Sequence, residues 1–253
     1  METPRIYCAG FLLCVVSTLA AGAVAFYLGL PLAEHAHPLA LPLLQVAAVY
    51  PAYLYLVRKG VLWRAAVLVL LWAAVESLLM VNATYSGTLR AAQAVINGEA
   101  YREEMFAWIR TGAGPEGDPA LFVVPKLREI ALFSAATFAS AGFLGLLMGS
   151  ILLNYMNYYV GCLLLAAKPG ALLQVALLSW QVYAVLRVVG YVLLGVALTR
   201  ISLLLWERRR VVVEPEAARF LVWAAVLIAA DFALKATVAN AFYQPLLSQL
   251  VRV

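Results

Sequence analysis

Residues 127–194 read LREIALFSAATFASAGFLGLLMGSILLNYMNYYVGCLLLAAKPGALLQVALLSWQVYAVLRVVGYVLL. After Arg128 and Glu129 this stretch is almost wholly apolar, whereas one membrane crossing needs only roughly 20 apolar residues. The chain must therefore turn back within it. We predict one turn at 154–157, where asparagines follow a series of small residues, and another at the Lys-Pro-Gly of 168–170, because proline and glycine end helices.

The composition of the whole chain also indicates a membrane protein. Hydrophobic residues make up 65% of the 253 residues and charged residues 12%, whereas soluble domains contain roughly 25% charged residues. This length allows six or seven spans and one modest polar segment, with no room for a separate catalytic domain. In such a protein the net charge of +5 mainly sets orientation. We therefore predict a multi-pass protein of the cell membrane with no nucleic-acid partner.

The cysteines and the N-terminus carry little further information. Cys8, Cys14 and Cys162 lie in apolar runs without a Cys-x-x-Cys pair, so they predict neither a disulfide framework nor a metal site. The apolar run at 6–30 is longer than the roughly 7 to 15 residues of a signal-peptide core, which favours a retained first span. Small residues at 20–23 leave a cleaved signal as the alternative.

We expect an all-α, polytopic transmembrane helix bundle with about seven spans in one integral membrane domain, 1–253. Three spans occupy 1–81, and a polar extracytoplasmic segment follows at 82–127, with amphipathic helices inside 86–126. A helical core occupies 128–253. The expected spans are 6–30, 39–57, 61–81, 129–151, a short or re-entrant helix at 154–167, 171–199 and 220–243.

Basic residues set the predicted orientation. Arg58, Lys59 and Arg64 flank the second and third spans, so the positive-inside rule places the N-terminus in the cytoplasm. If 154–167 crosses the membrane, the arginine-rich connection 206–219 is also cytoplasmic and the C-terminus lies outside. The sequence leaves open whether 154–167 crosses completely.

Small residues repeat at four-residue spacing in the fourth span. Ala141, Gly145 and Gly149 follow this spacing, and Gly142 stands beside them. Such faces let helix backbones approach closely in lipid. We interpret them as packing within one subunit, with self-association or contact with another membrane protein as the alternative.

Four ionisable residues lie inside the predicted spans: Glu76, Arg187, Asp231 and Lys235. Such groups are expensive in a bilayer and are therefore candidates for function. Asp231 and Lys235 stand four residues apart on one helix, so we expect them to neutralise each other. Arg187 then needs a carboxylate from elsewhere, and we expect Glu76. Ion or proton handling by these residues is the alternative interpretation.

Amide side chains form the other group of intramembrane candidates. Asn154, Asn157, Gln174 and Gln181 can bond neighbouring helices or satisfy the backbone at a bend. A transport site at a discontinuous helix would use the same groups. We favour the structural role.

Motifs of catalysis are absent from the sequence. Glu34, His35 and His37 are metal-compatible types, but no His-Glu-x-x-His or further cluster accompanies them. There is no glycine-rich phosphate loop, no Gly-x-Ser-x-Gly and no paired intramembrane carboxylates. We expect no enzymatic activity, no cofactor and no metal.

The order of features over 97–248 is also informative. They are a polar segment with Glu-Met-Phe at 104–106, a glycine-rich span at 142–149, Gly161, the Lys-Pro-Gly turn, an arginine-rich connection and an ending at 239–245. In this order the chain resembles the stage II sporulation protein M family of membrane proteins. It departs from the family at Asn240, where a glutamate is usual, at the Lys-Pro-Gly turn, which lacks the common histidine, and in having three N-terminal spans.

The resemblance implies a subunit of an envelope-associated complex that works through partners, without requiring sporulation. Our prediction is therefore a non-enzymatic membrane subunit or scaffold, surrounded by the lipid bilayer and bound to other membrane proteins or to itself. A transporter, channel or translocation-pore component that uses the intramembrane charges is the alternative.

Overall fold

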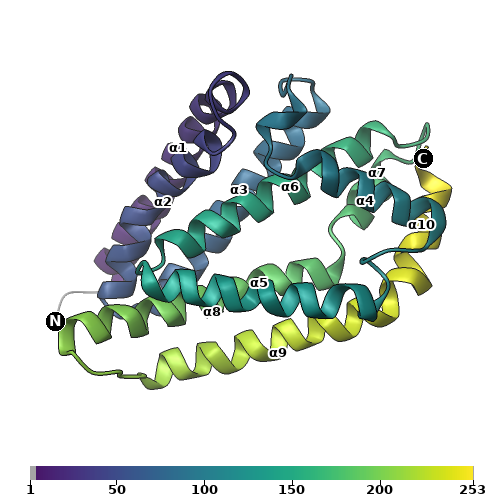
Figure 1. The fold of residues 1–253 in the computed structure, drawn as a ribbon. Coiled ribbons are helices and arrows are strands. Elements are labelled where there is room, and N and C mark those ends of the chain that lie inside the picture. Colours follow the sequence, from purple (N-terminus) through teal and green to yellow (C-terminus); the bar gives the residue numbers. More distant parts are fainter. Residues whose placement is uncertain (1–3, 253) are drawn as a thin grey trace.

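The computed structural model describes residues 4–252, and the side chains of residues 10–252, so the side chain of Cys8 lies outside the described part. The chain is all-helical (Figure 1), and within the described residues the only β-pairing is an isolated bridge between Ala167 and Val251. The elements are α1 (Pro4–His35), α2 (Ala40–Arg58), α3 (Leu62–Tyr85), η1 (Ala92–Ala94), α4 (Gly98–Thr111), α5 (Pro119–Ala139), α6 (Phe143–Leu165), α7 (Leu172–Ser179), α8 (Val182–Arg208), α9 (Pro215–Val238), the π-helical turn η2 (Ala239–Tyr243) and α10 (Gln244–Leu250).

Six of the described helical segments are long and apolar enough to cross a membrane, so the chain is a multi-pass membrane protein. They are Gly10–His35, Ala40–Arg58, Leu62–Tyr85, Phe143–Leu165, Leu172–Arg208 and Pro215–Leu250.

The bundle has two ends, and hydrogen bonds between distant segments define them. At the arginine-rich end, Arg200 Nη1 donates to the carbonyls of Val57 and Arg58, at 3.2 and 3.0 Å, and Ser202 Oγ donates to Phe138 O at 2.6 Å. At the opposite, C-terminal end, Lys168 N donates to Leu250 O at 2.9 Å.

Helix α5 runs between these two ends. It begins beside the loop that touches η2 and finishes next to α8 at the arginine-rich end, and Figure 1 shows it beside α8. It lies along the bundle, although it carries Lys126, Arg128 and Glu129. The described chain thus has six helical segments long and apolar enough to cross a membrane, where the sequence predicts about seven spans, and α5 lies against them without being one of the six.

The predicted bend at 154–157 is wrong. The chain turns instead at 140–142, where Ala141 and Gly142 have φ of +49° and +92°. A Cβ at Gly142 would overlap Thr199 Oγ1, so both the left-handed backbone and the close approach favour glycine. Asn154 and Asn157 lie inside α6. Their side-chain amides donate hydrogen bonds to Gln45 of α2 and Ser77 of α3, so they do not interrupt the helix. The division into spans 129–151 and 154–167 is replaced by α5 and one full-length α6.

The Lys-Pro-Gly turn is confirmed, since α6 ends at Leu165, α7 begins at Leu172 and Gly170 has φ of +81°. The span predicted at 171–199 is not continuous. Trp180 and Gln181 are extended, with ψ of 82° and 140°, and separate the short α7 from α8.

The polar segment docks on the bundle instead of lying free on the membrane surface. Met105, Trp108 and Ile109 of α4 are fully buried, and Trp108 Nε1 donates to Asn240 Oδ1 at 2.7 Å. Asp118 caps α5 by accepting from Ala120 N at 2.9 Å, ahead of a proline at the first turn. This segment therefore closes the C-terminal end.

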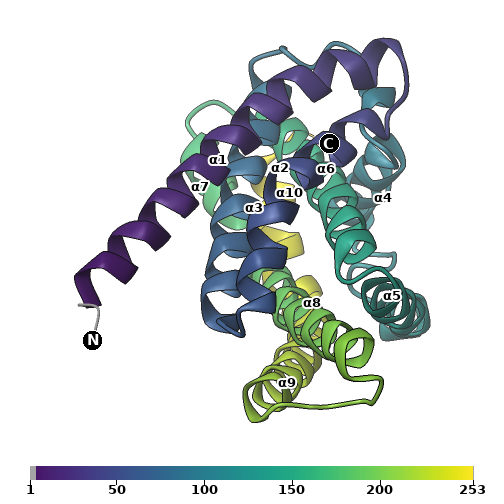
Figure 2. The ribbon, with the colours of Figure 1, turned by 90° about the vertical axis from the view of Figure 1, so that its left-hand side faces the viewer.

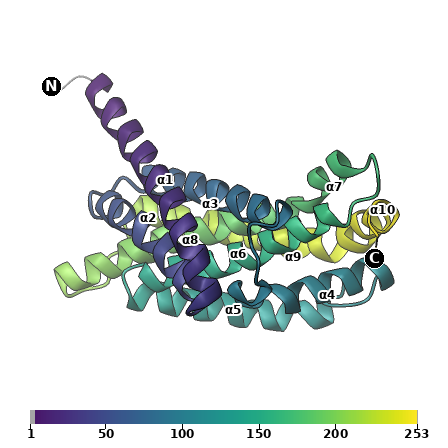
Figure 3. The same ribbon diagram turned by 90° about the horizontal axis from the view of Figure 1, so that it is seen from above.

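The core is divided along the bundle. A large cluster between α2, α3, α8 and α9 includes Tyr53, Leu62, Leu68, Trp72, Ala197 and Phe220, and a second cluster at the C-terminal end includes Met105, Trp108, Tyr159, Tyr183 and Leu247. The N-terminal half of α1 leans away from the other helices (Figures 2 and 3).

Candidate functional site

A buried, bidentate ion pair joins α8 to α9. Arg187 Nε donates to Asp231 Oδ2 at 2.8 Å and Nη2 donates to Oδ1 at 2.9 Å, a bidentate geometry. Asp231 is 0% exposed and Arg187 7%. A charge this far from water persists only with a partner, so the pair fixes the two helices against each other.

A second pair draws the outer loop into the bundle. Lys235 Nζ lies 2.9 Å from Glu116 Oε2, and Tyr183 OH donates to Glu116 Oε1 at 2.8 Å. The ammonium group also lies 4.8 Å from the centroid of the Phe122 ring. The sequence places Glu116 in the outer polar segment, and no local signal marks it as a buried partner of α9.

The third pair lies on α5. Lys126 Nζ contacts Glu129 Oε2 at 2.8 Å, and Tyr191 OH of α8 donates to Glu129 Oε1 at 2.8 Å. These three pairs form one group of three cations and three carboxylates on α5, α8, α9 and the loop before α5. We call it the paired-charge cluster: Glu116, Lys126, Glu129, Arg187, Asp231 and Lys235.

Two predicted pairings are wrong. Arg187 binds Asp231 and not Glu76, and Lys235 binds Glu116 instead of neutralising Asp231 on its own helix. Four-residue spacing does place Asp231 and Lys235 on one face of α9, but α8 and the loop at 112–118 present opposite charges to that face. Pairs between helices then outcompete the pair within one helix.

Glu76 belongs to a separate hydrogen-bond network centred on Gln45 of α2. Gln45 Nε2 donates to Glu76 Oε2 at 2.8 Å and to Asn154 Oδ1 at 3.1 Å. Its Oε1 accepts from Ser150 Oγ at 2.6 Å and from Asn154 Nδ2 at 2.8 Å. All four hydrogen-bond positions of the Gln45 amide are thus used. Gln45 is not among the residues predicted from the sequence, although a glutamine in an apolar span is a weak signal of such a network.

The other oxygen of Glu76 is unsatisfied. Glu76 is 2% exposed, and its Oε1 and the nearby Trp72 Nε1 have no hydrogen-bond partner among the described residues. Gly22 of α1 lies over this carboxyl, because a Cβ there would stand 2.9 Å from Oε1. No basic side chain lies within salt-bridge distance of Glu76 in the described part of the chain, so an ionised Glu76 would be buried without a counter-charge.

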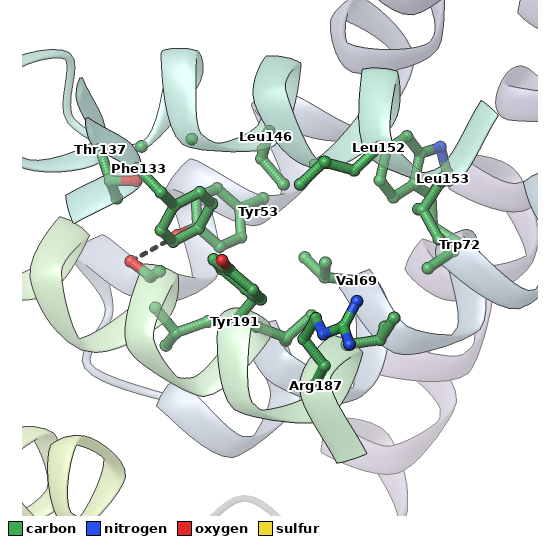
Figure 4. Close-up of a pocket in the computed structure, with 18 of the residues that line it drawn as sticks. Tyr53, Val69, Trp72, Phe133, Thr137, Leu146, Leu152, Leu153, Arg187 and Tyr191 are labelled. Carbon is green, nitrogen blue, oxygen red and sulfur yellow. Dashed lines mark hydrogen bonds between the residues drawn. The ribbon is translucent and has the colours of Figure 1, made fainter. Parts of the chain in front are cut away.

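A cavity of ≈ 80 Å³ separates the two networks. Figure 4 shows it between α3, α5, α6 and α8, with Trp72 at one side and Tyr191 and Arg187 at another. Its lining is predominantly apolar, with Lys126, Glu129 and Arg187 as the charged residues.

The predicted packing glycines have different surroundings. A Cβ at Gly145 would overlap Thr137 Oγ1 of α5, and Gly142 contacts α8, so both allow close helix packing within this chain. Gly149 has nothing within 4 Å of an added Cβ and lines the cavity instead. Ala141 lies in the α5–α6 turn, where its carbonyl accepts from Tyr50 OH at 3.3 Å.

Asn157 and Asn240 join elements at the C-terminal end, whereas Gln174 does not. Asn157 Nδ2 donates to Ser77 Oγ at 2.9 Å, and Asn157 Oδ1 accepts from Trp180 Nε1 at 3.0 Å. Asn240, which accepts from the Trp108 indole, also lies directly against Gly117. Gln174 is exposed on α7.

Glu34 and His37 hydrogen-bond to backbone N–H groups in the connections between helices. Glu34 Oε1 accepts from the backbone N–H groups of Arg90 and Ala91 at 2.6 and 3.3 Å, and His37 Nδ1 accepts from Leu39 N at 3.1 Å. Among the residues that the structure describes, no group of three or more His, Cys, Asp or Glu side chains is arranged to hold a metal.

An ion pair also locks the arginine-rich end. Arg200 Nε and Nη2 each donate to the Glu214 carboxylate at 2.9 Å. Hydrogen bonding to Arg200 holds the pKa of Glu214 below its ordinary value of 4.5. This contact ties α8 and the start of α9 to the end of α2.

Comparison of the chain with protein-family profiles, with curated proteins and with solved structures finds no match. The resemblance to the stage II sporulation protein M family stays a prediction from the order of residues. What can be argued about function comes from the geometry above.

Proposed function

We propose that this multi-pass membrane protein is a non-enzymatic subunit or scaffold that acts through a partner membrane protein. The observation that supports this most is the neutrality of the paired-charge cluster. Each of its three cations has a carboxylate oxygen within 2.9 Å. Separating one buried pair costs about 3–5 kcal/mol, so the cluster favours a fixed arrangement of α5, α8 and α9 over one that alternates during transport.

The docked outer segment supports the same proposal. Gln244 Nε2 donates to Ile109 O at 2.8 Å, and the Trp108–Asn240 bond lies beside it, so α4 is held in place on the C-terminal end. A fixed surface of this kind suits recognition of another envelope protein, as the family resemblance implies. By the positive-inside rule, the arginine-rich end would lie on the cytoplasmic side of the cell membrane, and α4 would lie on the outer side.

Reconstitution into liposomes tests this function. The wild-type protein is expected to give no flux of protons, Na⁺ or K⁺ above that of empty liposomes. In cells, a photoreactive residue in place of exposed Arg110 on α4 is expected to give one discrete crosslinked product, whose mass separates a partner from a second copy. The matched control is the same group at Trp223, which is 53% exposed on α9. Ion flux that Asp231→Asn abolishes in a folded protein would refute the scaffold.

One observation favours the alternative, a proton-handling transporter. Among the buried carboxylates that the structure describes, Glu76 has no basic partner, and its Oε1 has no hydrogen-bond partner. If the chain moves protons, Glu76→Gln abolishes proton flux while Gln45 retains its hydrogen bonds. The same liposomes decide between the two functions.

A further inference from the structure

A second cavity lies where the chain breaks between α7 and α8. Its volume is ≈ 370 Å³, within the range of about 300–1,000 Å³ typical of small-molecule sites. Apolar side chains from α3, α6 and α8 form most of its wall, among them Leu70, Ala73, Leu153, Val160 and Val188. It is distinct from the cavity beside the paired-charge cluster, although Ala73, Leu153, Met156 and Val188 line both.

Two polar groups in this cavity have no partner. Gln181 is 4% exposed and Tyr159 is 2% exposed, yet neither Gln181 Nε2 nor the Tyr159 hydroxyl forms a hydrogen bond with another described residue. The neighbouring polar groups cannot serve them, because Trp180, Asn157 and Ser77 bond one another in a chain. An unsatisfied buried donor costs free energy comparable to a lost hydrogen bond. A bound molecule with oxygen acceptors could supply the partners that these groups lack.

The lining also restricts the charge of that molecule. Of the side chains that the structure describes, no Asp, Glu, Lys, Arg or His lines the cavity. An ionised ligand would therefore lie at membrane depth without a counter-charge, which is strongly unfavourable. The polar part of the ligand is thus uncharged.

The mouth of the cavity opens toward lipid. Its exposed lining residues are Ala74 and Leu78 on α3, Trp180 at the break and Val185 on α8. Leu78 lies seven residues before Tyr85, the last residue of α3, which is about 10 Å along the helix axis. At that depth the surrounding medium is the hydrocarbon of the bilayer.

We propose that this cavity binds a neutral lipid, an uncharged amphiphile that enters sideways from the bilayer. Its carbonyl or hydroxyl oxygen accepts from Gln181 Nε2 and shares a hydrogen bond with Tyr159 OH, while its apolar chain lies between α3 and α8. This inference is independent of whether the chain is a scaffold or a transporter.

Photocrosslinking in phosphatidylcholine nanodiscs tests the proposal. The probes are a diacylglycerol and a phosphatidic acid that carry the same diazirine acyl chain, and mass spectrometry locates the labelled peptides. We expect diacylglycerol to label α3, α6 and α8 around the cavity in the wild type. Gln181→Leu, which removes the donor, and Ala74→Phe, which fills the mouth, should each reduce labelling about fivefold to tenfold. Gln174→Leu on exposed α7 is the matched control and should leave labelling unchanged.

A thermal measurement separates ligand binding from folding. Replacing an unpartnered amide by an apolar group of similar size costs little, so Gln181→Leu should keep the wild-type Tm in lipid-free detergent. A clear drop in Tm would show that Gln181 has a partner within the chain and would overturn the proposal. Labelling that is absent, that is unaffected by both cavity variants, or that is equally strong with phosphatidic acid would also overturn it.

Discussion

Replacement of Arg187 by leucine tests whether the paired-charge cluster is structural. In Arg187→Leu, Asp231 loses both hydrogen bonds of its bidentate pair and stays at 0% exposure. Lys235 is held by Glu116 at 2.9 Å and cannot replace Arg187 without breaking that pair. The remaining carboxylate is therefore buried without compensation.

The structure sets the size and the asymmetry of the effect. Removing one member of a buried pair costs about 3–5 kcal/mol, which for a chain of this length lowers Tm by about 6–20 °C. Asp231→Leu should cost less than Arg187→Leu, because Arg187 lines the ≈ 80 Å³ cavity together with Glu129 and can turn toward that carboxylate. The double variant should lie within about 1 kcal/mol of wild type, since two apolar residues replace the pair without an orphaned charge.

Thermal unfolding in detergent, followed by tryptophan fluorescence, measures all three variants. Arg102→Leu on α4 is the matched control, because it also removes an arginine–carboxylate pair, with Glu99, but side-chain exposures are 38% and 37%. Such exposed pairs contribute about 0–1 kcal/mol. A double variant as unstable as the sum of its single variants, or single variants no worse than the control, would refute the structural role.

Three further predictions concern other parts of the bundle. Gly145→Ala should lower the free energy of unfolding by about 1–2 kcal/mol, because the new methyl group overlaps the stiff Thr137 side chain. Gly149→Ala, which meets no neighbouring atom, should raise the free energy of unfolding by up to about 1 kcal/mol. Equal effects of the two variants in thermal unfolding would contradict the packing argument. Glu76→Gln should change stability by less than about 1 kcal/mol in the same assay, since the amide resembles a neutral carboxyl group, and a large loss would show that the site needs an anion. The fold lowers the pKa of Glu214 below its ordinary value of 4.5, so the contact between Glu214 and Arg200 should stabilise the fold at neutral pH. This stabilisation should be lost progressively as the pH falls below 4.5 and Glu214 becomes protonated. A Tm difference between wild type and Glu214→Gln that persists in acid would contradict this prediction.

The candidate site was only partly accessible to sequence reasoning. Arg187, Asp231 and Lys235 stand out because ionisable residues are rare in apolar segments, and the structure buries all three. Glu116, the partner of Lys235, and Gln45, the partner of Glu76, did not stand out. Glu116 lies in a polar loop with no local pattern that reveals burial, and Gln45 is a single uncharged residue in an apolar span, which is a weaker signal than a charge.

The bend between α5 and α6 shows a similar limit. The asparagines at 154 and 157 and the Ser-Ala-Gly sequence at 140–142 are both reasonable places to reverse a chain. The neighbouring helices decide where the chain reverses. Gln45 accepts a hydrogen bond from Asn154 and Ser77 accepts one from Asn157, so both asparagines lie within an unbroken α6. At position 142, Thr199 leaves room only for glycine.

The order of residues was enough to predict a multi-pass helical membrane protein, a turn at 168–170 and a cluster of arginines at one end. These properties follow from the transfer of each segment into lipid and from local backbone preference, which are sums over neighbouring residues. The pairing of charges, the break between α7 and α8 and the cavities became visible only in the folded chain. Those outcomes depend on which helix faces meet, and residues more than a hundred positions apart, such as Gln45 and Asn154, decide them together.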